Sequence, residues 1–214
     1  MRWLYAGVFC GLVCIAGFMI APSAHADVLF DLSSCAEAGL PASCNNVDSG
    51  HSTLTYTSGG QSLLVSGLNG AAPNDLLLKL TGGDPSETGL GLFNTVSSEV
   101  NPGQSEVFNF SSLASHGFTS GTFLIGSLQA GEVGRLAFDS TSVTAVEVGS
   151  TGISAPIPFT FSVSQPLVTL TATSGNVLAA ARLDIAPTPE PATLALVTPA
   201  LGGLALLRRR RQRS

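Results

Sequence analysis

The residues that could carry acid–base or nucleophilic chemistry in this chain are few and scattered. His51 and His116 stand far apart, and neither lies in an H-E-x-x-H pattern or near a G-x-S-x-G turn. The many serine and threonine residues suit the solvent-facing positions of strands. The residues of a Ser-His-Asp triad or of a glycosidase carboxylate pair can be distant in the sequence and still meet in the folded protein. A secreted hydrolase therefore stays a distant alternative. Because no motif supports that alternative, we expect that the chain is not an enzyme.

Oxygen ligands for a metal ion gather around one turn of the sequence. Glu99, Asn101 and Glu106 lie close together around Pro102-Gly103. Calcium takes about six to eight oxygen ligands, mostly from carboxylates and carbonyls. The chain has no D-x-D-x-D-G loop, however, and the same residues are equally typical of solvated loop acids. No cofactor is therefore expected, and calcium is left open with these three residues as candidate ligands.

An apolar stretch at the N-terminus predicts export. Arg2 precedes the apolar residues 3–20, and Pro22 is followed by the triplet Ala24-His25-Ala26. A positive start, an apolar core and a small-x-small site are typical of a signal peptide, so we predict cleavage after Ala26. The alternative is an uncleaved membrane anchor, for which the apolar run is just long enough.

Export to an oxidising compartment would determine the oxidation state of the cysteines that remain after signal-peptide cleavage. Cys10 and Cys14 leave with the signal peptide, whereas Cys35 and Cys44 stay in a segment rich in small and polar residues. In an oxidising compartment these two residues are expected to form a disulfide, since two thiols alone do not complete a zinc site. Closing a loop of this size would contribute roughly 2–3 kcal/mol.

The C-terminal segment contains three parts in a fixed order. Pro189-Glu190-Pro191 is followed by the apolar residues 192–207 and by the basic tail 208–214. The basic tail would stay in the cytoplasm as a stop-transfer element, with the preceding domain outside. Its arginines are Arg208, Arg209, Arg210, Arg211 and Arg213. A glycosylphosphatidylinositol signal or a plain, never-cut membrane anchor are the alternatives.

This C-terminal arrangement, behind a signal peptide, resembles the PEP-CTERM sorting signal. The resemblance implies recognition of Pro189, Glu190 and Pro191 by an exosortase, a membrane enzyme of Gram-negative bacteria. It implies removal of the tail and transfer of the protein from the inner membrane to the cell surface or extracellular matrix. The run Gly89-Leu90-Gly91, followed by Glu99 and Glu106, also loosely resembles a pattern of PEP-CTERM ectodomains.

The segment between the two ends is predicted to consist of short strands with turns between them. Apolar residues alternate with polar ones most clearly in 107–110 and 160–163, which places them on opposite faces of a sheet. A short helix is expected near Ser111–Ser115. The expected strands are Val28–Leu32, His51–Thr57, Ser62–Ser66, Asp75–Thr81, Gly89–Phe93, Glu106–Ser111, Gly121–Leu128, Gly134–Asp139, Val143–Val148, Ile157–Val163, Leu167–Ala172 and Val177–Ile185.

These patterns predict an all-β protein: a jelly-roll-like antiparallel β-sandwich with an N-terminal signal helix and a C-terminal transmembrane helix. The signal peptide is residues 1–26, the sandwich ectodomain 27–186, and the sorting signal 187–214. Within the ectodomain about 13 acidic and 3 basic residues give a charge of roughly −10. Such an acidic body argues against nucleic-acid binding, which needs a cationic surface.

The expected function is that of an exported surface or matrix protein with a structural or adhesive role. Its expected partners are signal peptidase and the exosortase during processing, the membrane through the C-terminal helix, and exopolysaccharide afterwards. A calcium-dependent carbohydrate-binding module is the alternative function. Strong stacking on sugars is disfavoured, because Tyr56 is the one tyrosine and no tryptophan remains after cleavage.

Overall fold

The computed structural model describes residues 26–80, 85–93 and 98–187. These residues belong to one compact unit, Ala26–Thr188. Among them no helix has both the length and the apolar character needed to cross a membrane. The predicted signal helix, the Ala24 position of its cleavage site, the sorting motif 189–191, the transmembrane helix 192–207 and the basic tail all lie outside the described residues.

The domain is all-β, and every strand pair in its three sheets is antiparallel. A seven-stranded sheet has the order β11-β10-β13-β7-β3-β2, with β4 paired to β3, and two four-stranded sheets have the orders β1-β15-β8-β12 and β5-β6-β14-β9. The strands are β1 Val28–Asp31, β2 Thr53–Ser58, β3 Gln61–Asn69, β4 Ala72–Pro73, β5 Leu76–Lys79, β6 Gly89–Leu92, β7 Gln104–Asn109, β8 Phe118–Phe123, β9 Ile125–Gly126, β10 Val133–Phe138, β11 Thr141–Ala145, β12 Ile157–Thr160, β13 Leu167–Ser174, β14 Leu178–Ala180 and β15 Arg182–Pro187.

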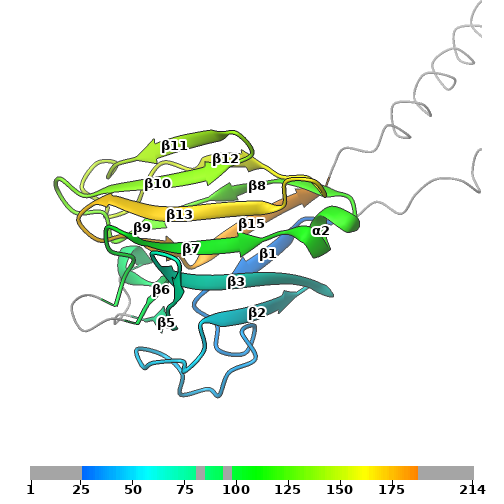
Figure 1. Cartoon of the computed structure of the whole chain (residues 1–214), viewed down its shortest axis with the longest axis horizontal. Coiled ribbons are helices and arrows are strands. Elements are labelled where there is room, and N and C mark those ends of the chain that lie inside the picture. The colour runs from blue at the N-terminus through cyan, green and yellow to red at the C-terminus, as the bar shows by residue number, and fades with distance from the viewer. Residues whose placement is uncertain (1–25, 81–84, 94–97, 188–214) are drawn as a thin grey trace, which may run out of the picture. The chain divides into compact units, whose positions relative to one another are not determined.

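The seven-stranded sheet and the sheet β1-β15-β8-β12 pack face to face as a sandwich-like pair of layers (Figure 1). Aromatic rings from facing strands meet between them. The rings of Phe108 on β7 and Phe123 on β8 have centroids 5.1 Å apart, and those of Phe138 on β10 and Phe159 on β12 are 6.2 Å apart. These phenylalanines are the core-facing members of alternating strands, so the alternation in the sequence builds the core directly.

The sequence predicted the elements well but missed where the chain changes sheets. The helix α2, Ser111–Ser115, confirms the prediction. The predicted strand 121–128 is divided between β8 and β9, and 177–185 between β14 and β15, and in each case the two halves belong to different sheets. A strand that turns a corner between layers keeps its extended pattern, so periodicity alone does not reveal the corner. The short strand β4 and the 3-10 helix η1, Pro85–Glu87, were not predicted.

The predicted disulfide between Cys35 and Cys44 is confirmed, with a Cα–Cα distance of 5.9 Å. The loop around it covers two sheet edges. The Thr57 amide of β2 donates to the carbonyl of Glu37 (2.9 Å), and the amide of Asn46 donates to the carbonyl of Leu78 on β5 (2.8 Å). Both β2 and β5 are edge strands, so the cross-linked loop satisfies backbone groups that would otherwise be open to pairing with another chain.

Candidate functional site

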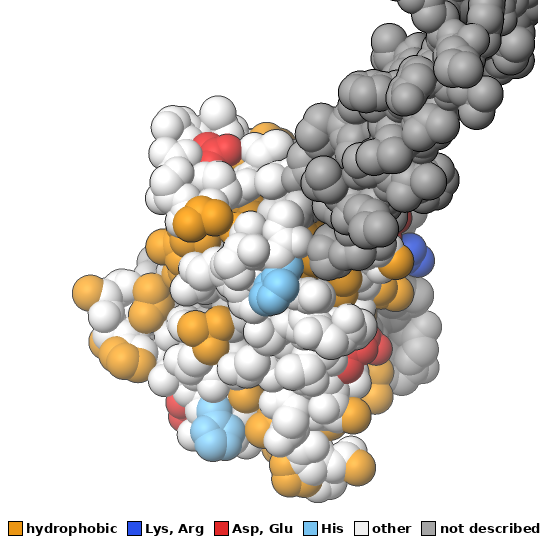
Figure 2. Space-filling model, turned by 90° about the vertical axis from the view of Figure 1, so that its right-hand side faces the viewer, with side chains coloured by type: hydrophobic (Ala, Val, Ile, Leu, Met, Phe, Trp, Pro, Cys, Tyr) orange, Lys and Arg blue, Asp and Glu red, His pale blue; other side chains and the backbone are white. Residues whose placement is uncertain are grey.

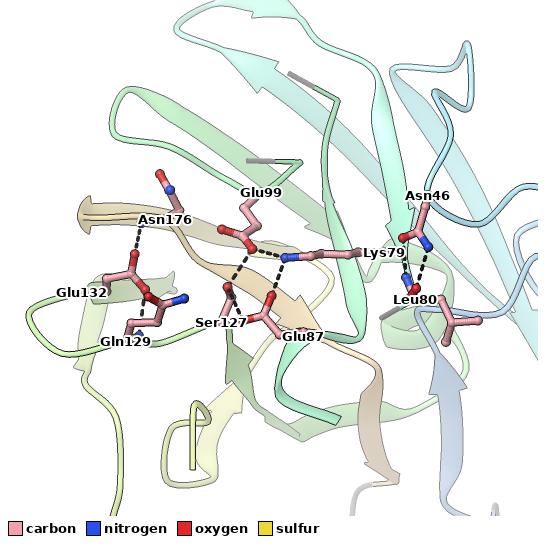
Figure 3. A network of polar contacts seen from close by, with 9 residues as sticks. All are labelled: Asn46, Lys79, Leu80, Glu87, Glu99, Ser127, Gln129, Glu132 and Asn176. Atoms are coloured by element: carbon pink, nitrogen blue, oxygen red, sulfur yellow. Dashed lines mark hydrogen bonds and ion pairs between the residues drawn. The ribbon is translucent and has the colours of Figure 1, made fainter. Parts of the chain in front are cut away.

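A connected polar cluster of the described residues is built around Lys79 at the end of β5 (Figure 3). Its ammonium donates hydrogen bonds to Oε2 of Glu87 in η1 and to Oε1 of Glu99. Ser127 follows β9, and its Oγ lies 2.7 Å from Oε1 of Glu99 and 3.0 Å from Oε1 of Glu87. One lysine and one hydroxyl therefore join two carboxylates from separate segments of the chain.

The chemistry of this cluster is that of a partly buried ion pair. Burial lowers the pKa of Lys79, but hydrogen bonds to Glu87 and Glu99 outweigh that effect and leave the pKa raised above its ordinary value. A lysine that acts as a general base needs a lowered pKa, so Lys79 is unsuited to activate the neighbouring hydroxyl of Ser127. The cluster ties β5, η1 and the turn after β9 together.

The glycines of the Gly89-Leu90-Gly91 run let other segments approach β6 closely. A Cβ at Gly89 would stand 1.9 Å from the carbonyl oxygen of Ala179, and one at Gly91 would stand 2.4 Å from that of Ser98. Side chains at these positions would push away β14 and the segment that carries Glu99. The run thus has a packing role that positions the Lys79 cluster.

The three candidate calcium ligands are not brought together as a metal site. Glu99 contacts Lys79 and Ser127, and the backbone amide of Asn101 donates a hydrogen bond to Oε1 of Gln104 (2.9 Å). Glu106 points into the core from β7, where it is fully buried. Among the described residues no group of three or more histidine, cysteine or acidic residues is arranged to hold a metal ion.

Glu106 is the unusual carboxyl of the core. It pairs across the sheet with Gly67 on β3 and Leu170 on β13, and neither of its carboxyl oxygens has a hydrogen-bond partner among the described residues. Burial without a partner raises the pKa of Glu106 well above its ordinary value. It also contributes to the raised pKa of Tyr56, for which burial is the larger cause.

Both described histidines lie on the surface, and Figure 2 shows them as two separate groups. His116 follows α2, where its Nδ1 lies 2.7 Å from the carbonyl oxygen of Ser112. Its side-chain neighbour is the hydroxyl of Ser115 at 3.5 Å. The described part of the chain therefore gives these histidines no carboxylate partner of the kind that a hydrolytic triad uses.

One concave site of the described residues is a groove of about 590 Å³ on the outer face of the sheet β1-β15-β8-β12. Its floor consists of small side chains that lie side by side across the strands: Ala186 on β15, Ser120 on β8 and Thr160 on β12 form one row. Thr122 on β8 is flanked by Asp184 on one side and Pro158 on the other. Short side chains on neighbouring strands leave the hollow between longer ones.

Charged and ring side chains line the rest of the groove. Nε of Arg182 donates to both carboxyl oxygens of Asp184, at 3.1 and 3.0 Å. Asp27 adds a second carboxylate, and Phe138 reaches the groove from β10 of the facing sheet. Sequence analysis did not identify this site. The signal available was the run of small residues 119–122, but its partners 158–160 and 182–186 are distant in the chain.

Comparisons with known proteins identify no relative of this chain. No family model matches the chain, and no curated protein and no solved structure is significantly similar to it.

Proposed function

We propose that this chain is an exported protein of the bacterial cell surface or extracellular matrix, sorted by an exosortase, with a non-enzymatic structural or adhesive role. The observation that carries the proposal is the order of Pro189-Glu190-Pro191, the apolar stretch 192–207 and the basic tail 208–214, in a chain that begins with a signal-peptide pattern. In this proposal signal peptidase and the exosortase act on the two ends, and the sandwich is the part delivered.

Two features of the domain are compatible with this route. The buried disulfide suits an oxidising compartment outside the cytoplasm. The first and last strands pair antiparallel, with Val28 opposite Ile185, so the chain enters and leaves the domain at the same end. A tether that follows β15 would leave the outer faces of the sandwich available for contacts with the matrix.

The finer topology belongs to the same proposal. A jelly-roll-like connectivity is supported by the mixed order of strands in both layers, where β7 lies between β3 and β13 and β8 lies between β12 and β15. Such connections bring residues from distant parts of the chain to one outer face. The delivered domain would then carry its adhesive surface on a sheet and not on a single loop.

The test is the mass of the protein recovered from its native host, compared with a variant in which Pro189, Glu190 and Pro191 are replaced by alanine. We expect the wild type to lack both the signal peptide and the C-terminal tail. The triple variant is expected to keep its tail and to stay in the membrane fraction. The control is Thr193→Ala/Thr198→Ala, which changes the apolar stretch conservatively and leaves the motif intact.

If the wild type and the triple variant both keep the tail, the protein is an ordinary membrane-anchored domain and the sorting proposal is wrong. If both lose the tail, the Pro-Glu-Pro motif is not the recognition element. A variant with the five arginines of the tail replaced by alanine separates recognition from membrane retention, because it keeps the motif but loses the cytoplasmic positive charge.

A further inference from the structure

We propose that the groove on the outer face of the sheet β1-β15-β8-β12 binds an uncharged polysaccharide, without a metal ion. This inference rests on the proposed function, since it names the matrix component that the delivered domain would hold. It concerns a site made of residues from β8, β12, β15 and β10, together with Asp27, which precedes β1.

The shape suits a chain of sugar rings. The groove measures about 590 Å³ and is lined by residues that lie side by side on the neighbouring strands β15, β8 and β12. Its floor is the row Ala186, Ser120 and Thr160, whose short side chains let a ligand approach the sheet. Pockets of about 300–1,000 Å³ are usual for organic ligands, which this groove matches.

The hydrogen-bonding groups suit ring hydroxyls, which both donate and accept. The carboxylates of Asp27 and Asp184 accept only, Arg182 donates only, and Thr122 and Ser120 can do either. The contact of Arg182 with Asp184 uses Nε, and no other carboxylate of the described residues pairs with this guanidinium. Its Nη donors are therefore available to a ligand that the neighbouring carboxylate also binds.

Ring side chains supply the apolar part of the groove. Phe138 is partly buried against the core, and Pro158 is exposed beside Thr122. A pyranose has an apolar face made of its C–H groups, which packs against such rings. The mixture of small hydroxyls, two carboxylates, a guanidinium and apolar rings differs from the aromatic and apolar centre of a typical protein–protein interface.

The charge of the groove selects among polysaccharides. Arg182 is already paired with Asp184, and Asp27 adds a further negative charge. A third carboxylate, Asp139, accepts a hydrogen bond from Oγ1 of Thr160 at 2.8 Å. Uronate or sulfate groups would meet like charge here and in the acidic body as a whole, so an uncharged chain is the better fit.

The experiment is affinity gel electrophoresis of the exported protein, with polysaccharides cast in native gels. The probes are hydroxyethyl-cellulose, glucomannan, galactomannan, dextran and the purified matrix polysaccharide of the host, with alginate as the acidic probe and chitosan as the cationic one. The test variant is Ser120→Tyr, which places a large ring on the floor of the groove. The matched control is Thr55→Tyr, an equally large change at an exposed position of β2 in the other sheet.

We expect at least one uncharged polysaccharide to retard the wild type, and Ser120→Tyr to weaken this binding about tenfold or more. Thr55→Tyr and addition of a calcium chelator should leave the binding unchanged. The proposal is overturned if no uncharged probe retards the protein, if only chitosan or alginate does, or if both tyrosine variants behave alike. Tail processing in Ser120→Tyr is measured separately, so loss of polysaccharide binding and failure of the sorting proposal are distinguishable.

Discussion

Two buried glutamates of this domain, seven positions apart in the sequence, have opposite surroundings. Glu99 is 6% exposed and contacts the ammonium of Lys79 and the hydroxyl of Ser127 (Figure 3). Glu106 is 0% exposed, and no hydrogen bond reaches its carboxyl oxygens from the described residues. The first belongs to an ion pair at the junction of several segments, and the second lies among apolar side chains of the main core.

The comparison shows that burial alone does not decide the state of a carboxyl group. Removing a carboxylate from water is unfavourable unless a cation or several donors replace the water. Glu99 has such partners, so its burial can stabilise the packing of β5 against the turn after β9. Glu106 has none, so its pKa rises and the domain should be less stable than one with an uncharged group there.

The largest expected effect comes from removing the cation that Glu99 and Glu87 share. Lys79→Met should lower the free energy of unfolding by about 3 kcal/mol, because it leaves two carboxylates without a counter-charge in a largely buried place. Urea denaturation of the purified protein measures this. Arg182→Met is the control: it removes an ion pair whose side chains are 66% and 44% exposed, and its denaturation midpoint should not move. Equal effects of the two variants would contradict the comparison.

A smaller effect of opposite sign is expected at the second glutamate. Glu106→Gln should raise the free energy of unfolding at pH 7 by about 1–2 kcal/mol, since the amide has nearly the same shape but does not ionise. The same denaturation experiment measures it. Asp27→Asn, at an exposed position, should change nothing. If Glu106→Gln lowers the free energy of unfolding instead, the folded protein is more stable with an ionised carboxylate at position 106 than with a neutral side chain.

The pH dependence of stability should separate the wild type from Glu106→Gln. The pKa of Glu106 is raised in the folded state, so below the unfolded-state pKa of about 4.3 the carboxyl is protonated in both states and has no effect. As the pH rises above that value, the unfolded chain loses this proton first, and stability falls by at most about 1.4 kcal/mol per pH unit until the folded-state pKa is reached. Thermal unfolding between pH 4 and pH 8 measures the slope, which Glu106→Gln should reduce. Parallel profiles would show that the folded-state pKa is ordinary.

The smallest expected effect concerns the hydroxyl between the two partnered carboxylates. Ser127→Ala should lower the free energy of unfolding by about 1 kcal/mol, because one buried hydrogen bond is lost while Lys79 stays in place. A double-mutant cycle with Lys79→Met measures whether the two groups act together. Strict additivity of the two changes would show that the hydroxyl and the ammonium do not belong to one network.

Most strands of this fold could be predicted from the sequence, but the surroundings of its glutamates could not. Glu106 shares the strand parity of Phe108, a signal that it faces the core, yet its closeness to Glu99 and Asn101 suggested a metal ligand instead. Lys79 was also missed as a site residue. It is the single lysine of the sequence and follows three leucines, which is an unusual place for a solvated charge.

By itself the sequence determined the all-β class, most strand positions, the helix 111–115 and the disulfide, because each depends on local periodicity, turn residues or a short loop. It also contains the terminal patterns from which the proposed function infers export and sorting. Only the tertiary structure decided which strands lie side by side, and hence that residues 120–122, 158–160 and 182–186 form one groove. It likewise decided which glutamate meets a lysine. Strand order depends on the free energy of packing between segments that are distant in the chain. Local sequence patterns do not report that free energy.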